Sequence, residues 1–145
     1  MNKKEVQQRV LQNGKPLDLD KFEWDKKARV FSTIEKELVL DFAGIDGVTF
    51  DTGWYCTFNT GPDCTFNTGP DCTFDTGSGC TFDTGEECVV VRRDIYEVIE
   101  LEEGKPIKLN GYGIKGFTYI NSHKITIDGA EIASGNKEKS LEYNG

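Results

Sequence analysis

The residues best suited to chemistry in this chain are its five cysteines, which recur at every eighth position. They are Cys56, Cys64, Cys72, Cys80 and Cys88. Such a series could form a disulfide ladder or a stack of metal ions. The spacing favours neither, because zinc sites use short Cys-x₂₋₄-Cys pairs and stacked strands ~4.8 Å apart are poorly spaced for the ~3.8 Å Cβ separation of a disulfide. Val48 stands at the same place in the pattern. We therefore interpret the cysteines as reduced, buried core residues, and we predict no metal and no cofactor.

Two columns of oxygen-bearing side chains repeat with the same period. One holds Asn or Asp, at Asp51, Asn59, Asn67, Asp75 and Asp83. The other holds Thr, at Thr49, Thr57, Thr65, Thr73 and Thr81. The columns suggest an alternative function, a solenoid that binds calcium or ice. A solvated strand face explains both columns equally simply, because Ca²⁺ needs six to eight oxygens and Thr is a common exposed strand residue.

Other catalytic signals are weak. His123, the one histidine of the sequence, lies in a turn-like stretch, and no nucleophile stands at a spacing that would indicate a catalytic pair. The sequence also contains no phosphate-binding loop, dinucleotide fingerprint or paired-carboxylate signal. We therefore predict that the protein is not an enzyme.

The element that positions these columns is an octapeptide repeat. From residue 48 each octad reads Val or Cys, Thr, Phe, Asn or Asp, Thr and Gly, followed by two variable residues. Side chains alternate between the two faces of a strand, so the first and third residues of each octad point inward and the Thr between them points outward. The predicted repeat core is Val48, Phe50, Cys56, Phe58, Cys64, Phe66, Cys72, Phe74, Cys80, Phe82 and Cys88.

Each octad also carries the signature of a corner. The second Thr of the octad turns inward, where its hydroxyl can bond a turn backbone group. The following glycine is expected to take the positive φ of a tight turn, at Gly53, Gly61, Gly69, Gly77 and Gly85. One octad buries too little surface to fold alone, so the octads must stack. The pattern predicts an all-β solenoid (a β-helix) with two octads per coil; the alternative is a triangular β-prism of three intertwined chains.

The flanks of the repeat have the composition of caps. Residues 1–47 are expected to form an N-terminal cap, with a short helix over residues 2–12 and strands at 17–19, 29–31 and 38–40. Residues 48–95 form the solenoid. Residues 96–145 form a C-terminal β cap, with strands at 96–101, 107–109, 117–120 and 124–127 and a polar tail.

Charge and composition limit the partners. The net charge is −8, and residues 48–87 contain seven acidic residues and no Lys or Arg. A basic face for nucleic acid is therefore not expected. No apolar run reaches the ~20 residues of a membrane span, and the first residues show no signal peptide. We expect a location in the cytoplasm or in a virion, and the sequence leaves the partner and a homo-oligomer open.

The run Cys-Thr-Phe-Asn-Thr-Gly-Pro-Asp-Cys-Thr-Phe, residues 56–66, resembles octapeptide repeats of uncharacterised phage and prophage proteins. The resemblance covers residues 40–95 and implies a structural or adhesive part of a virion or tail. We therefore expect a non-enzymatic structural or interaction module that is associated with phage. Trp54 and Tyr55 replace the usual corner residues of the first octad. They could form a contact site or pack under the N-terminal cap.

Overall fold

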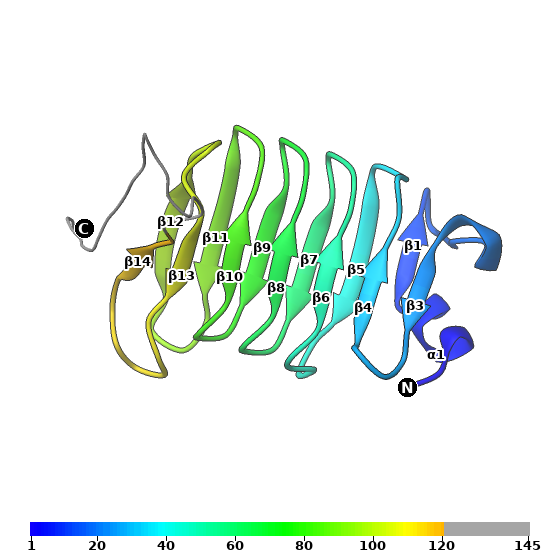
Figure 1. Cartoon of the computed structure of the whole chain (residues 1–145), viewed down its shortest axis with the longest axis horizontal. Coiled ribbons are helices and arrows are strands. Elements are labelled where there is room, and N and C mark those ends of the chain that lie inside the picture. Colours follow the sequence, from blue (N-terminus) through cyan, green and yellow to red (C-terminus); the bar gives the residue numbers. More distant parts are fainter. Residues whose placement is uncertain (121–145) are drawn as a thin grey trace, which may run out of the picture.

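The protein is a β-solenoid of about 4 turns, built from two parallel walls (Figure 1). The computed structural model describes residues 1–120. His123, the strand predicted at residues 124–127 and the predicted polar tail lie outside the described residues. Within residues 1–120, no helix has the length and apolar character needed to cross a membrane.

The two walls are sheets with seven strands each. Sheet A is ordered β12 (Glu97–Leu101), β11 (Cys88–Arg92), β9 (Thr73–Thr76), β7 (Thr57–Thr60), β5 (Leu38–Phe42), β1 (Val10–Gln12) and β2 (Lys15–Pro16). Sheet B is ordered β14 (Phe117–Tyr119), β13 (Ile107–Leu109), β10 (Thr81–Asp83), β8 (Thr65–Asn67), β6 (Thr49–Asp51), β4 (Val30–Ser32) and β3 (Glu23–Asp25).

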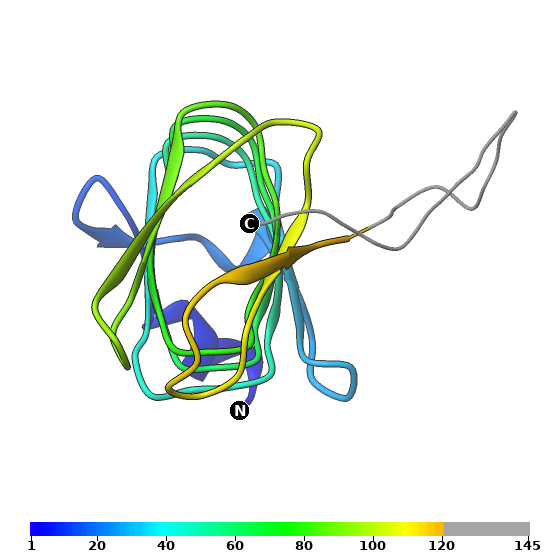
Figure 2. The same ribbon diagram turned by 90° about the vertical axis from the view of Figure 1, so that its left-hand side faces the viewer.

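The chain crosses from one sheet to the other after every octad, so two octads complete one coil. Parallel pairing joins residues sixteen apart: Phe50 pairs with Phe66 and Phe66 with Phe82 in sheet B, and Phe58 pairs with Phe74 in sheet A. The end-on view of Figure 2 shows the successive coils nearly superimposed. The predicted single-chain solenoid with two octads per coil is confirmed.

The core is a slab of phenylalanine rings between the sheets. Rings stack along each sheet, with centroids 5.3 Å apart for Phe50–Phe66 and 5.0 Å apart for Phe58–Phe74. Rings from opposite sheets meet edge-on, as in Phe58–Phe66 at 5.1 Å and 75°. Both arrangements are favourable for aromatic pairs. Every predicted core residue of the repeat is buried, so the inward and outward assignment of the octad is confirmed.

The role predicted for the corner glycines is wrong. Gly53, Gly61, Gly69, Gly77 and Gly85 do not have positive φ. The left-handed residue is the one directly before each inward cysteine, as in Asp63 (φ 60) and Asp71 (φ 61). The glycines are needed because the backbones of successive coils touch at the corners: a Cβ on Gly85 would lie 2.5 Å from the nitrogen of Pro70. The inward Thr prediction is confirmed, since the Thr60 hydroxyl donates to the carbonyl oxygen of Gly61 at 3.1 Å.

The N-terminal cap differs from the prediction in two places. Helix α1 spans only Lys3–Gln7, held by a capping box between Asn2 and Glu5. After a turn at residues 8–9, the rest of the predicted helix is strand β1, because Val10–Gln12 pairs with β5 on one side and with the edge strand β2 on the other. The strand predicted at residues 17–19 is absent: β2 ends at Pro16, and Leu19 begins a 3₁₀ turn, η1 (Leu19–Lys21), on the stretch that leads the chain from sheet A to sheet B. The other predicted strands within residues 1–120 are present, with ends that differ by one or two residues.

Candidate functional site

The cysteines form two internal stacks, one at each corner of the solenoid. Cys56, Cys72 and Cys88 lie at one corner, and Cys64 and Cys80 at the other; all five are free and buried. In each stack a backbone N–H lies 3.4 Å from the sulfur one coil further on, as between Cys56 and Cys72. The cysteines therefore fill space inside the corners, as Val48 does in the first coil.

The stacked thiols influence one another's ionisation. The thiol of Cys72 lowers the pKa of Cys56 to about 7, and the thiol of Cys80 does the same for Cys64, in both cases against the effect of burial. The pKa values of Cys72, Cys80 and Cys88 are raised, mainly by the preceding thiol in the stack. These sulfurs have almost no solvent exposure, so the stacks offer no open reactive site.

The Thr and Asn/Asp columns lie on the outer faces of both sheets, in register. On sheet B, Thr49, Thr65 and Thr81 form one row, and beside it Asp51, Asn67 and Asp83 form the second. On sheet A the rows are shorter, because Val39 and Val89 flank Thr57 and Thr73. Sheet B thus presents the more regular polar face, with one repeat per coil.

Acidic side chains of the described part form no metal centre. Within residues 1–120, no group of three or more His, Cys, Asp or Glu side chains is arranged to hold a metal ion. The carboxylate of Asp63 lies instead against the next coil, where a Cβ on Gly79 would be 2.3 Å from its Oδ1. Asp75 on sheet A is bound by Arg93, which also contacts the side-chain oxygen of Asn59 at 3.0 Å.

A buried arginine, missed in the sequence analysis, closes the C-terminal end of the core. Arg92 is fully buried at an inward position of β11. Its guanidinium donates to both carboxylate oxygens of Asp94 and to the carbonyl oxygens of Gly111 and Ile114, and lies 3.5 Å from Glu97. The sequence signal was a charged residue on the inward parity of Cys88 and Val90. The contacts fasten the loop between β13 and β14, so we assign Arg92 a structural role.

Trp54 and Tyr55 lie on the surface, where the connection from β6 to β7 stacks on the connection from β4 to β5. Trp54 is 39% exposed and Tyr55 is 53% exposed, with ring centroids 5.0 Å apart. The ammonium of Lys36 lies over the Trp54 ring at 4.5 Å. Ile34 on the same connection is 93% exposed. We call these four residues the aromatic corner.

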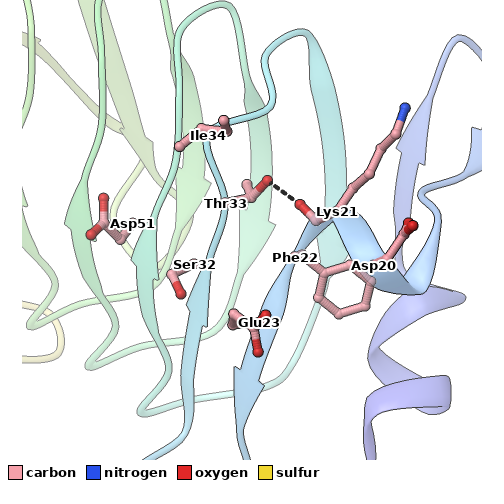
Figure 3. A pocket seen from close by; sticks show the side chains of 8 residues that line it. All are labelled: Asp20, Lys21, Phe22, Glu23, Ser32, Thr33, Ile34 and Asp51. Carbon is pink, nitrogen blue, oxygen red and sulfur yellow. Dashed lines mark hydrogen bonds between the residues drawn. The ribbon is translucent and has the colours of Figure 1, made fainter.

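An open cleft of about 340 Å³ lies beside the aromatic corner, on the outer side of sheet B (Figure 3). Its lining runs from η1 and β3 to β4 and β6, and Ile34 belongs to both the cleft and the corner. Three carboxylates line it, from Asp20, Glu23 and Asp51, with Lys21 as the one basic residue of the lining. The hydroxyl of Thr33 donates to the carbonyl oxygen of Lys21 at 2.7 Å and ties the two walls of the cleft together.

Comparisons with known proteins give no relative for this arrangement: no protein-family model, no curated protein and no solved structure matches the chain.

Proposed function

We propose that this protein is a non-enzymatic structural or interaction module, associated with a phage or prophage as a virion or tail accessory. The observation that supports this best is the division of the repeat between inside and outside. Its thiols and phenyl rings are buried, and its outer faces are polar rows repeated at every coil. Backbone hydrogen bonds continue through the corners, for example from Gly61 to Ile45 at 2.9 Å. A surface held in this way suits contact with another molecule.

A tagged copy of the chain, produced in its own host, tests this proposal. After induction of the prophage, particles are separated on a density gradient and the tagged chain is followed by immunoblot. We expect the chain to sediment with particles and to be released from them by denaturant. A chain that stays at the top of the gradient in every induced culture would contradict the phage association.

One observation supports a second candidate, a lattice- or ion-binding face. The Thr row and the Asn/Asp row of sheet B repeat once per coil, at roughly 4.8 Å, as a periodic surface would require. Growth of a single ice crystal in the protein solution tests binding to ice, and calorimetry with CaCl₂ tests binding of calcium. Faceted ice or a saturable heat of calcium binding, lost in Thr65→Lys, would establish this alternative in place of the first.

A further inference from the structure

The aromatic corner is the place where the repeat departs from its own pattern. The two variable residues of the later octads are Pro62-Asp63, Pro70-Asp71, Ser78-Gly79 and Glu86-Glu87, all small or polar. Only the first octad carries two aromatic rings at these positions. The departure therefore calls for an explanation other than the requirements of the solenoid.

Folding does not supply that explanation. Tyr55 has φ 58, a left-handed backbone conformation that costs an ordinary L-residue about 1–2 kcal/mol. At the equivalent places of the later octads, Asp63, Asp71 and Gly79 are residue types that tolerate this conformation best, and Glu87 adopts it with φ 63. The Tyr55 side chain is about half exposed, so its burial offsets little of this conformational cost. Neither the turn nor burial therefore requires two aromatic rings at this corner.

The backbone of the aromatic corner is held on both sides by neighbouring coils. Glu37 donates its N–H to the carbonyl oxygen of Trp54 at 2.9 Å, and Tyr55 donates to that of Pro70 at 3.1 Å. Gly53, directly before Trp54, donates to the carbonyl oxygen of Glu35 at 3.2 Å. Because the backbone carrying both rings is already ordered, a partner would not have to order it on binding.

The chemistry around the rings favours a cation. The Trp54 ring already holds the ammonium of Lys36, which shows that a cation can occupy its face. Three acidic residues lie on the connections that carry or flank the rings, namely Glu35, Glu37 and Asp71, against Lys36 as the one base. The carboxylate of Glu35 also accepts a hydrogen bond from Gln12 at 3.3 Å. The adjoining cleft adds the carboxylates of Asp20, Glu23 and Asp51 against Lys21. Lys and Arg side chains can use both the rings and the carboxylates, since Arg stacks on aromatic faces and pairs with carboxylates.

We propose that the aromatic corner binds a basic, arginine- or lysine-containing polypeptide segment. A basic side chain of the partner takes the place of Lys36 on Trp54 and extends toward the carboxylates of the corner and cleft. This inference rests on the proposed interaction function and names the class of its partner.

The two tryptophans of the chain provide a direct test. Trp24 packs against the core and donates its indole N–H to the carbonyl oxygen of Met1 at 2.9 Å, so it serves as an internal reference for Trp54. ¹⁵N-labelled protein is titrated at 150 mM salt with an acetylated and amidated hexa-arginine peptide. We expect a saturable shift of the Trp54 indole signal, with the Trp24 signal moving much less.

Three variants sharpen this test. Trp54→Ala, followed through the backbone amide signals, should weaken peptide binding about tenfold or more. Lys36→Ala should strengthen it several-fold, because it frees the ring and removes a positive charge. Tyr96→Ala removes an exposed ring from the C-terminal part of the solenoid and should leave binding unchanged. The melting temperature of each variant verifies that it is folded.

Several outcomes would overturn the inference. Equal affinity of Trp54→Ala and the parent protein for the peptide would mean that the peptide is held by diffuse attraction to the acidic repeat, residues 48–87. A shift of Trp54 with a neutral hexasaccharide but not with the peptide would assign the corner to carbohydrate, and the absence of any shift would show that no basic segment binds. Sedimentation with phage particles would still stand in each case, so failure of this inference is distinguishable from failure of the proposed function.

Discussion

At the scale of single residues, the two arginines after the last cysteine show that burial determines how much an ion pair contributes to stability. Arg92 is fully buried and satisfied by carboxylates and carbonyls, whereas the Arg93 side chain is 39% exposed. Removing one partner of a buried ion pair costs about 3–5 kcal/mol, because the other is left without compensation. Exposed pairs contribute about 0–1 kcal/mol after screening by solvent.

We therefore expect Arg92→Met to lower the free energy of unfolding by about 3–5 kcal/mol, and Arg93→Met by about 1 kcal/mol or less. Urea denaturation at pH 7 measures both. Burial alone would raise the pKa of Asp94, but the Arg92 guanidinium and the Gly113 N–H outweigh it and hold this pKa below its ordinary value. The stabilisation by Arg92 is thus present above about pH 4 and declines as the pH falls further. Equal costs for the two variants would contradict the structural role of Arg92.

The cysteines give a second prediction at this scale. All five thiols should react with a thiol reagent in denaturant and almost none in the native protein, even at pH 8. The pKa of Cys56 is only about 7, so the native resistance would come from burial and not from lack of ionisation. Fast native labelling of two or more thiols, or fewer than five thiols in unreduced denatured protein, would refute this account.

At the scale of the elements, the Asn residues of the outer rows separate like charges. On sheet B, Asn67 lies between Asp51 and Asp83. Asn67→Asp would place three carboxylates roughly 4.8 Å apart, at about 1 kcal/mol for each adjacent pair in water before screening. We expect a lower melting temperature at 10 mM salt and recovery at 1 M salt.

Asn59→Asp on sheet A is the matched control. Its side-chain oxygen already accepts a hydrogen bond from Arg93 at 3.0 Å, so a carboxylate there would gain an ion pair as well as two like-charged neighbours, Asp41 and Asp75. We expect a smaller loss than for Asn67→Asp. A larger loss of melting temperature for Asn59→Asp, or a salt-independent effect of Asn67→Asp, would mean that repulsion between like charges in the rows does not limit stability.

The corners make a separate prediction. A Cβ on Gly85 would lie 2.5 Å from the nitrogen of Pro70, whereas one on Gly111 would meet nothing within 4 Å. Gly85→Ala should therefore destabilise by about 1–3 kcal/mol, while Gly111→Ala should be neutral or slightly stabilising. Thermal unfolding of the two variants compares them directly, and tolerance of Gly85→Ala would show that the coils can separate at the corners.

At the scale of the whole molecule, the repeat made much of the fold predictable. The alternation of Cys, Thr and Phe determines which side chains enter the core, and the octad length determines where the chain changes sheet. The same local pattern could not reveal contacts between distant residues. Val10–Gln12 has a helical pattern but pairs with β5, and the left-handed turn falls on the residue before each cysteine and not on the glycine.

The candidate site was predictable only in part for the same reason. Trp54 and Tyr55 are conspicuous in the sequence, since they interrupt a regular series. Their neighbours Lys36 and Ile34 cannot be recognised from the sequence, because these residues reach the rings only through the stacking of two connections. Arg92 likewise meets Gly111 and Ile114 across about twenty residues of sequence.

Above all, two octads form one coil of a single chain, so that the Thr and Asn/Asp rows repeat every sixteen residues. Nuclear Overhauser contacts between backbone protons of neighbouring strands measure this directly. We predict contacts between residues sixteen apart, such as Phe66 with Phe50 and with Phe82, within one molecule in a mixture of labelled and unlabelled protein. Contacts at a spacing of twenty-four residues, or contacts between labelled and unlabelled chains, would contradict it.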